Sequence, residues 1–175
     1  REHLNDFHLN VAGEYVYDGA LSACQNDDAK QRRSKRAVWG MAAILTVAVA
    51  AGGCIPAPGM QNCFYVLLPY LGEFLGTASV IWALAKLGMD WGTVREYNYK
   101  KSMAVLPMRT AVTAVFSGLG IVCELIFFFV NDHAGQTFFA LLYILLKLIA
   151  LLSVLVLRAE IMQAEWDKLP KKDNS

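Results

Sequence analysis

The sequence predicts an all-α integral membrane protein built as a four-transmembrane-helix bundle. Hydrophobic residues make up 56% of its 175 residues, above the roughly 45–50% that is typical of soluble domains. The excess lies in apolar blocks long enough to cross a bilayer, since a spanning helix needs about 17–25 residues. These blocks are 37–55, 64–87, 104–130 and 137–157.

The distribution of basic residues predicts that both termini lie in the cytoplasm. Fourteen of the 16 Lys and Arg residues fall in or beside three polar segments, which are 1–36, 86–101 and 158–172. The connections 56–63 and 131–136 contain no Lys or Arg. Because basic residues in short loops stay on the cytoplasmic side, we expect an N-in/C-in protein of the cytoplasmic membrane with two short outer loops.

A basic run precedes the first block and is interpreted as a set of inner-interface anchors. Arg32, Arg33, Lys35 and Arg36 stand next to the apolar residues, where anionic lipid headgroups attract basic side chains. Arg109 lies five residues into the third block and is expected to snorkel to the same interface. No aromatic residues are interleaved with the run, so the lipid bilayer is the expected partner and nucleic acid is not.

The polar segment 1–36 is expected to be cytoplasmic and partly ordered. Phe7–Tyr17 alternates weakly, which favours a small hairpin or, equally, an ordered loop. From Ala20 the pattern favours a helix that runs towards the first block. Since the block 37–55 follows a long polar stretch and lacks a cleavage motif, we expect a permanent span and not a signal peptide.

The other inner segments are expected to be helical or to lie at the membrane interface. The connection 88–103 carries aromatic rings between charges, which is typical of an interfacial turn or short helix. In segment 158–175 the helical pattern continues through Leu169, and Pro170 then ends the helix before a loose tail.

Cysteine and histidine usage argues against redox or metal chemistry. Cys54 and Cys63 bracket the first outer loop, so a disulfide between them is left open. The chain has no C-x-x-C pair and no metal-ligand spacing, and we therefore expect no metal site and no cofactor.

Two charges of opposite sign stand in the middle of apolar blocks. Glu73 is nine residues from Phe64 and Lys147 is nine from Phe138, so both lie roughly 14 Å deep. Such charges are costly and normally have a partner, a cavity or a task. The pair can be a packing lock, a proton- or ion-linked site, or a salt bridge to a partner subunit. Glu124 lies within reach of the same cluster.

A bend and a close helix contact are predicted beside Glu73. Pro69 lies one turn before it and can kink the helix. Gly72 and Gly76 form a G-x-x-x-G element, which lets another helix approach closely. Pro107 is expected to bend the third block in the same way.

An internal repeat is a further hypothesis, with chance similarity as its alternative. Residues 37–41 align with 104–108, and at a second offset Glu73 aligns with Lys147. A true duplication would be a parallel two-plus-two repeat whose pseudo-two-fold axis lies along the membrane normal.

These features favour a transport-related function. We expect an oligomeric carrier or channel subunit, or an accessory subunit of a larger transporter, in which Glu73 binds a proton or cation. The alternative is a scaffold that does not transport and instead holds a cytosolic or membrane partner. Because catalytic motifs are absent from the sequence, an enzyme is the least favoured reading.

Overall fold

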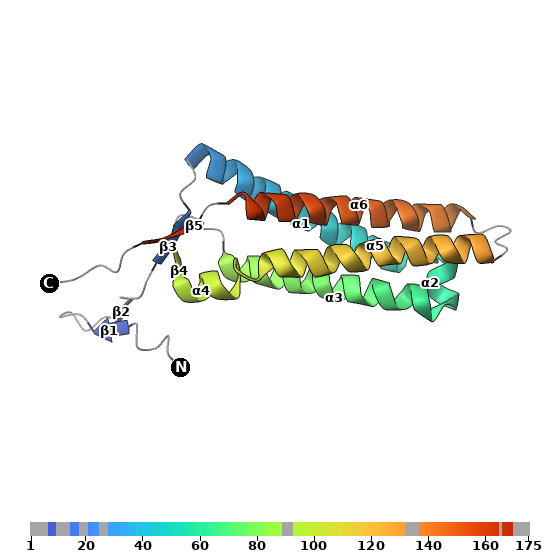
Figure 1. The fold of residues 1–175 in the computed structure, drawn as a ribbon, viewed down its shortest axis with the longest axis horizontal. Coiled ribbons are helices and arrows are strands. Elements are labelled where there is room, and N and C mark those ends of the chain that lie inside the picture. Colours follow the sequence, from blue (N-terminus) through green and yellow to red (C-terminus); the bar gives the residue numbers. More distant parts are fainter. Residues whose placement is uncertain are drawn as a thin grey trace.

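In the computed structural model, four long helices run alongside one another (Figure 1). The structure describes residues 7–9, 15–17, 21–24, 28–88, 93–131, 137–164 and 166–169. The long helices are α1 (Asp28–Cys54), α3 (Phe64–Leu87), α5 (Leu106–Val130) and α6 (Thr137–Met162). All four are long and apolar enough to cross a membrane, which confirms the predicted helical bundle.

The helices follow one another around the bundle in the order in which they occur in the chain, and α1 closes the ring against α6. Helix α1 packs mainly on α6, α6 packs on α5, and α5 packs on α3. As a result α3 and α6 lie diagonally across the bundle from each other, as do α1 and α5. A side chain that joins α3 to α6 therefore has to pass through the bundle centre.

Prolines and glycines set several helix boundaries. Pro107 lies in the first turn of α5, where the missing amide hydrogen costs nothing. The expected bend at Pro107 is therefore wrong, because the proline starts the helix. Helix α3 runs without interruption across Pro69. It ends at Gly88, whose φ of 74° suits the left-handed turn that closes a helix, and whose amide donates to the Leu84 carbonyl.

A short helix closes the bundle at the end opposite the strands (Figure 1). Helix α2 (Pro58–Asn62) forms most of the connection between α1 and α3. It packs on both α3 and α5, and Pro58 and Gly59 are buried. The first predicted outer loop is thus an ordered cap.

Short strands gather at the other end of the bundle. Strands β1 (Phe7–Leu9) and β2 (Tyr15–Tyr17) pair as an antiparallel hairpin, which confirms the hairpin and not the ordered loop. A second sheet has the order β4-β3-β5 and is antiparallel throughout. Its strands are β3 (Leu21–Cys24), β4 (Thr93–Arg95) and β5 (Trp166–Leu169).

The second sheet corrects two sequence predictions. Strand β3 occupies part of the segment from Ala20 that was expected to be helical, and α1 begins only at Asp28. Helix α6 ends at Met162, and Trp166–Leu169 form strand β5 instead of prolonging the helix. The connection between α3 and α5 contains β4 followed by the short helix α4 (Glu96–Lys101). Pairing between distant segments decides these structures, and tertiary pairing overrides local propensity.

The sheet also brings the three polar segments together. Ser22 of β3 pairs with Val94 of β4 on one side and with Lys168 of β5 on the other. The segment before α1, the connection between α3 and α5 and the segment after α6 therefore meet at one end of the bundle (Figure 1).

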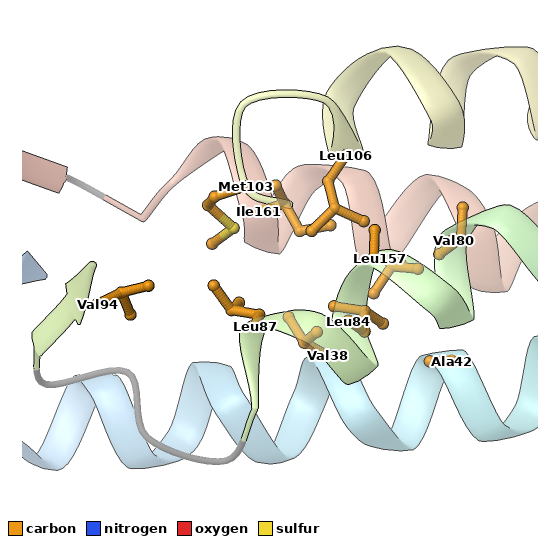
Figure 2. Close-up of a cluster of buried hydrophobic side chains, with 11 residues drawn as sticks. Val38, Ala42, Val80, Leu84, Leu87, Val94, Met103, Leu106, Leu157 and Ile161 are labelled. Carbon is orange, nitrogen blue, oxygen red and sulfur yellow. The ribbon is translucent and has the colours of Figure 1, made fainter. Parts of the chain in front are cut away.

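An apolar cluster fills the bundle next to the sheet. Figure 2 shows side chains from α1, α3, α5 and α6 directed into one space, with Val94 of β4 and Met103 at its edge. Its largest buried members are Leu84, Leu106 and Leu157. This cluster, called the sheet-end cluster below, joins the four long helices to the sheet.

The outside of the bundle is strongly apolar. Phe129 is 80% exposed, and Met108 is 74% exposed. Large exposed apolar side chains lie on all four long helices, as expected of surfaces that face lipid. Several polar side chains are buried instead, and they define the candidate site.

Candidate functional site

An ion pair crosses the centre of the bundle. The Lys147 Nζ of α6 donates a hydrogen bond to the Glu73 Oε2 of α3. Glu73 is completely buried and Lys147 is 2% exposed. Because α3 and α6 are diagonal partners, the pair lies between all four helices and is closed within one chain.

Two tyrosine rings flank the ammonium group. The Lys147 Nζ lies 4.7 Å from the centroid of the Tyr70 ring and 5.2 Å from that of Tyr143. At such distances the negative ring faces attract a cation. The Tyr70 hydroxyl donates to the Val49 carbonyl of α1 at 3.3 Å, and the Ser117 hydroxyl of α5 donates to the Lys147 carbonyl at 3.4 Å. Every long helix thus contributes to the site.

Helix α5 turns a polar stripe towards the bundle centre. The stripe consists of Thr110, Thr113, Ser117, Gly120 and Glu124, all of them buried. Their spacing of three and four residues places them on one face. A Cβ at Gly120 would stand 3.6 Å from the Lys147 Cε and Nζ, so the lysine side chain runs directly against the α5 backbone.

Three buried oxygens near the pair have no hydrogen-bond partner among the described residues. They are the Glu73 Oε1, the Thr77 Oγ1 and the Tyr143 hydroxyl. Thr77 lies one turn beyond Glu73 on the buried face of α3. Since buried polar atoms are nearly always satisfied, this group has the capacity to bind a proton, water or a small cation.

Glu124 belongs to the same cluster. It is fully buried, and its charge acts on Lys147 together with that of Glu73. A Cβ on Gly59 would overlap the Glu124 carboxylate and stand 3.0 Å from the Phe127 ring. The backbone of α2 therefore covers this carboxylate, and a larger residue at position 59 would displace it. The two buried carboxylates come from different helices, Glu73 from α3 and Glu124 from α5.

The glycines near Glu73 lie at the contact between α3 and α5. A Cβ on Gly72 would enter the Phe116 ring, and a Cβ on Gly76 would stand 3.3 Å from the Thr113 Cα. The G-x-x-x-G element thus packs on α5, which brings the α5 stripe close to Glu73.

Two arginines near the sheet end donate hydrogen bonds to backbone carbonyls of neighbouring helices. The Arg109 Nη1 donates to the Ser79 carbonyl of α3 at 2.8 Å. The Arg158 Nη1 similarly donates to the Pro107 carbonyl at 2.9 Å, a contact the sequence did not suggest. Both arginines join neighbouring helices through backbone acceptors. The anchors of the basic run lie in the first turns of α1.

Cysteines and acidic residues form no further site in the described part of the chain. Cys54 and Cys63 are free, so the disulfide that the sequence left open is not formed, and Cys123 is also free. No group of His, Cys, Asp and Glu within the described residues is arranged to hold a metal ion.

Sequence reasoning missed the polar stripe of α5 and the two tyrosines. Single threonines and serines are unremarkable in an apolar block, but their recurrence at 110, 113 and 117, with Glu124 two turns later, was a readable signal. None of the known protein families, curated proteins or solved structures compared with this chain matches it.

Proposed function

We propose that the protein is a transport-related subunit of the cytoplasmic membrane, in which the Glu73–Lys147 pair handles a proton or a small cation. The observation that carries the proposal is the buried polar centre. A bundle that only had to hold together would have no need of unpartnered oxygens beside a charged pair, because each of them costs free energy.

The cycle rests on two buried carboxylates, Glu73 and Glu124, whose charges both act on Lys147. In the resting arrangement the ammonium group neutralises Glu73. When a proton or cation binds Glu73, the attraction between Glu73 and Lys147 falls, and the ammonium group shifts towards Glu124. The buried Tyr143 and Thr77 oxygens, which have no hydrogen-bond partner among the described residues, accept or donate hydrogen bonds during this exchange. A carrier of this size would work as an oligomer or with a partner membrane subunit.

The test is proton flux into vesicles that contain the purified full-length protein. A potassium gradient with valinomycin drives the flux, and a trapped pH-sensitive dye reports it. Wild type is expected to pass protons above the level of empty vesicles, and Glu73→Gln is expected to abolish this flux. Glu160→Gln is the matched control, because Glu160 lies near the sheet end of α6. A Glu73→Gln variant with full flux would end the proposal.

A scaffold is the second candidate, and one observation favours it. The ion pair is nearly inaccessible from the surface, as a packing lock would be. In this case the sheet at the end of the bundle would present the polar segments to a partner. A scaffold would tolerate exchange of the two charges, with Glu73→Lys and Lys147→Glu combined, whereas a carrier would not. Wild-type vesicles that pass neither protons, Na⁺ nor K⁺ would favour the scaffold.

The membrane orientation is part of the proposal. We infer that the sheet end faces the cytoplasm, because it carries the basic segments. The free thiol of Cys63, next to α2 at the opposite end, provides the test. In intact cells a membrane-impermeant maleimide should label Cys63, whereas a cysteine introduced at Lys100 should react only after lysis. The reverse pattern would overturn the orientation.

The two-plus-two repeat also remains a proposal. Its offset of 74 between the second and fourth spans places buried Val80 on buried Val154. Its offset of 67 between the first and third spans places buried Leu45 on exposed Val112, whereas an offset of 68 places it on buried Thr113. The burial pattern therefore supports the offset of 74 between the second and fourth spans. For the first and third spans it favours an offset of 68 over one of 67.

A further inference from the structure

The first turns of α1 carry a basic hollow on the outside of the bundle. Arg32, Arg33 and Arg36, together with Ala29, line a surface hollow of about 540 Å³. Their spacing places all four residues on one face of the helix. All three arginines are exposed.

These arginines are free to bind a ligand. Within the part of the chain that the structure describes, none of the three guanidinium groups makes a hydrogen bond or an ion pair. The nearby carboxylate of Glu160 accepts a hydrogen bond from Ser34 at 3.0 Å. Ser34 is buried on the opposite side of α1, against α6, so this interaction leaves the arginine face open.

The arginine face continues into the membrane as a stripe of small side chains. Gly40, Ala43, Val47 and Ala50 follow Arg36 on the same side of α1 and are all exposed. A Cβ on Gly40 would meet nothing within 4 Å. These four residues, called the track below, therefore form an exposed apolar surface of α1 that begins beside the three arginines.

We propose that this face of α1 is a binding site for one anionic phospholipid. The headgroup phosphate would accept hydrogen bonds from Arg32, Arg33 and Arg36, since guanidinium groups bind phosphate oxygens in a bidentate manner. One acyl chain would lie along the track from Gly40 to Ala50. The proposal differs from general attraction to a charged surface in two respects, which are a defined hollow for the phosphate and a defined path for the chain.

The continuity of the two parts selects the ligand. A soluble phosphate or an acidic peptide would use the arginines alone and leave the track empty. A zwitterionic lipid would use the track, but it offers no net negative charge to three unpaired guanidinium groups. Only an anionic phospholipid matches both the charge and the apolar depth.

The first experiment measures lipid binding to the full-length protein after its lipids have been removed in neutral detergent. Phosphatidylglycerol is titrated against phosphatidylcholine, and bound lipid is counted by native mass spectrometry. Wild type should retain one phosphatidylglycerol in preference to phosphatidylcholine. The triple Gln variant of Arg32, Arg33 and Arg36 should bind it about a hundredfold more weakly, because each basic residue near an anionic surface contributes about fivefold in affinity.

A matched variant controls for net charge. Replacement of Lys86, Lys100 and Lys101 by Gln removes the same charge at the same end of the bundle, and it should leave phosphatidylglycerol binding within a few-fold of wild type. An equal loss in both triple variants, or no loss in the arginine variant, would overturn the proposal. Displacement of the lipid by inorganic phosphate or by an acidic peptide would also overturn it, if it occurred at the concentrations at which such soluble anions ordinarily bind proteins.

The second experiment tests the acyl track while the arginines stay in place. Gly40→Leu fills the start of the track from an exposed position where an added Cβ meets nothing within 4 Å, so the fold should be retained. Phosphatidylglycerol binding should fall several-fold with an unchanged thermal unfolding midpoint. Unchanged binding by Gly40→Leu would show that the site binds headgroups only, and the phospholipid proposal would then fail.

Discussion

Both halves of the bundle interior are well buried, but only one of them contains charged side chains. Near the sheet, the space between the helices is filled by aliphatic side chains such as Leu84 and Leu157 (Figure 2). Towards α2, the corresponding space holds Glu73, Lys147 and Glu124, all buried. Burial alone therefore does not distinguish a structural core from a functional site. The two differ in the free energy of burial, because burying a charged side chain is costly whereas burying an aliphatic one is not.

The membrane setting sharpens this contrast. Lipid tails are as apolar as leucine, so aliphatic side chains gain little from leaving lipid, and packing and polar contacts hold the helices together. The sheet-end cluster is then stabilised mainly by close packing and by its attachment to the sheet. The polar centre is stabilised by charge pairing, and its loss should cost more than the loss of one aliphatic contact.

The largest effect is expected when Lys147 is removed. Lys147→Met leaves the Glu73 carboxylate buried without its partner, which should destabilise the protein by about 3–5 kcal/mol. The measurement is reversible unfolding in mixed micelles. A single variant as stable as wild type would contradict the pairing.

The sheet-end cluster should show a smaller and purely structural effect. Leu84→Ala removes a fully buried side chain and should cost about 2–3 kcal/mol, the lower part of the usual range, since lost packing is the main term in lipid. The unfolding midpoint should fall while proton flux per folded molecule is unchanged. A flux defect in Leu84→Ala would break the division between the two halves.

A single methyl group added at the contact between α3 and α5 should lower the free energy of unfolding. Gly76→Ala places a Cβ against Thr113 and should cost about 1–2 kcal/mol, as overpacking does. Gly118→Ala is the matched control, because a Cβ there meets nothing within 4 Å, and it should be neutral or stabilising through helix propensity. Equal effects of the two variants would show that the close approach at Gly76 does not matter.

The smallest effect is expected at the link between α1 and α6. Ser34→Ala removes one partly buried hydrogen bond to Glu160 and should cost about 0.5–1 kcal/mol. Glu160→Gln keeps an acceptor for the serine and should cost less than Ser34→Ala. The reverse order, measured by the same unfolding assay, would mean that the charge of Glu160 acts elsewhere.

The helical part of the fold could be read from the sequence because its signal is local. The block 64–87 coincides with α3, and the other three blocks lie within or nearly within α1, α5 and α6. Long apolar runs carry this information regardless of the rest of the chain. The central sheet strand β3 could not be read in this way, since Ser22 pairs with residues 72 and 146 positions away.

The site was predictable to the extent that its residues were unusual for their surroundings. Glu73 and Lys147 are lone charges in apolar blocks, and the sequence therefore singled them out. Tyr70, Tyr143 and Ser117 are ordinary residues in a membrane helix, and only the packing of α3, α5 and α6 brings them to the ion pair. The diagonal arrangement of α3 and α6 follows from the sequential order of the four helices around the bundle, but which faces of these helices turn inward depends on their packing.

We propose that the polar centre is a working site and that the sheet-end cluster only maintains the fold. The double variant Glu73→Gln with Lys147→Met tests it most directly, because it removes both charges without leaving either one unpaired and should therefore stay folded. In the vesicle assay the account predicts a folded protein with no proton flux above empty vesicles. A folded double variant that passes protons at the wild-type rate would contradict it.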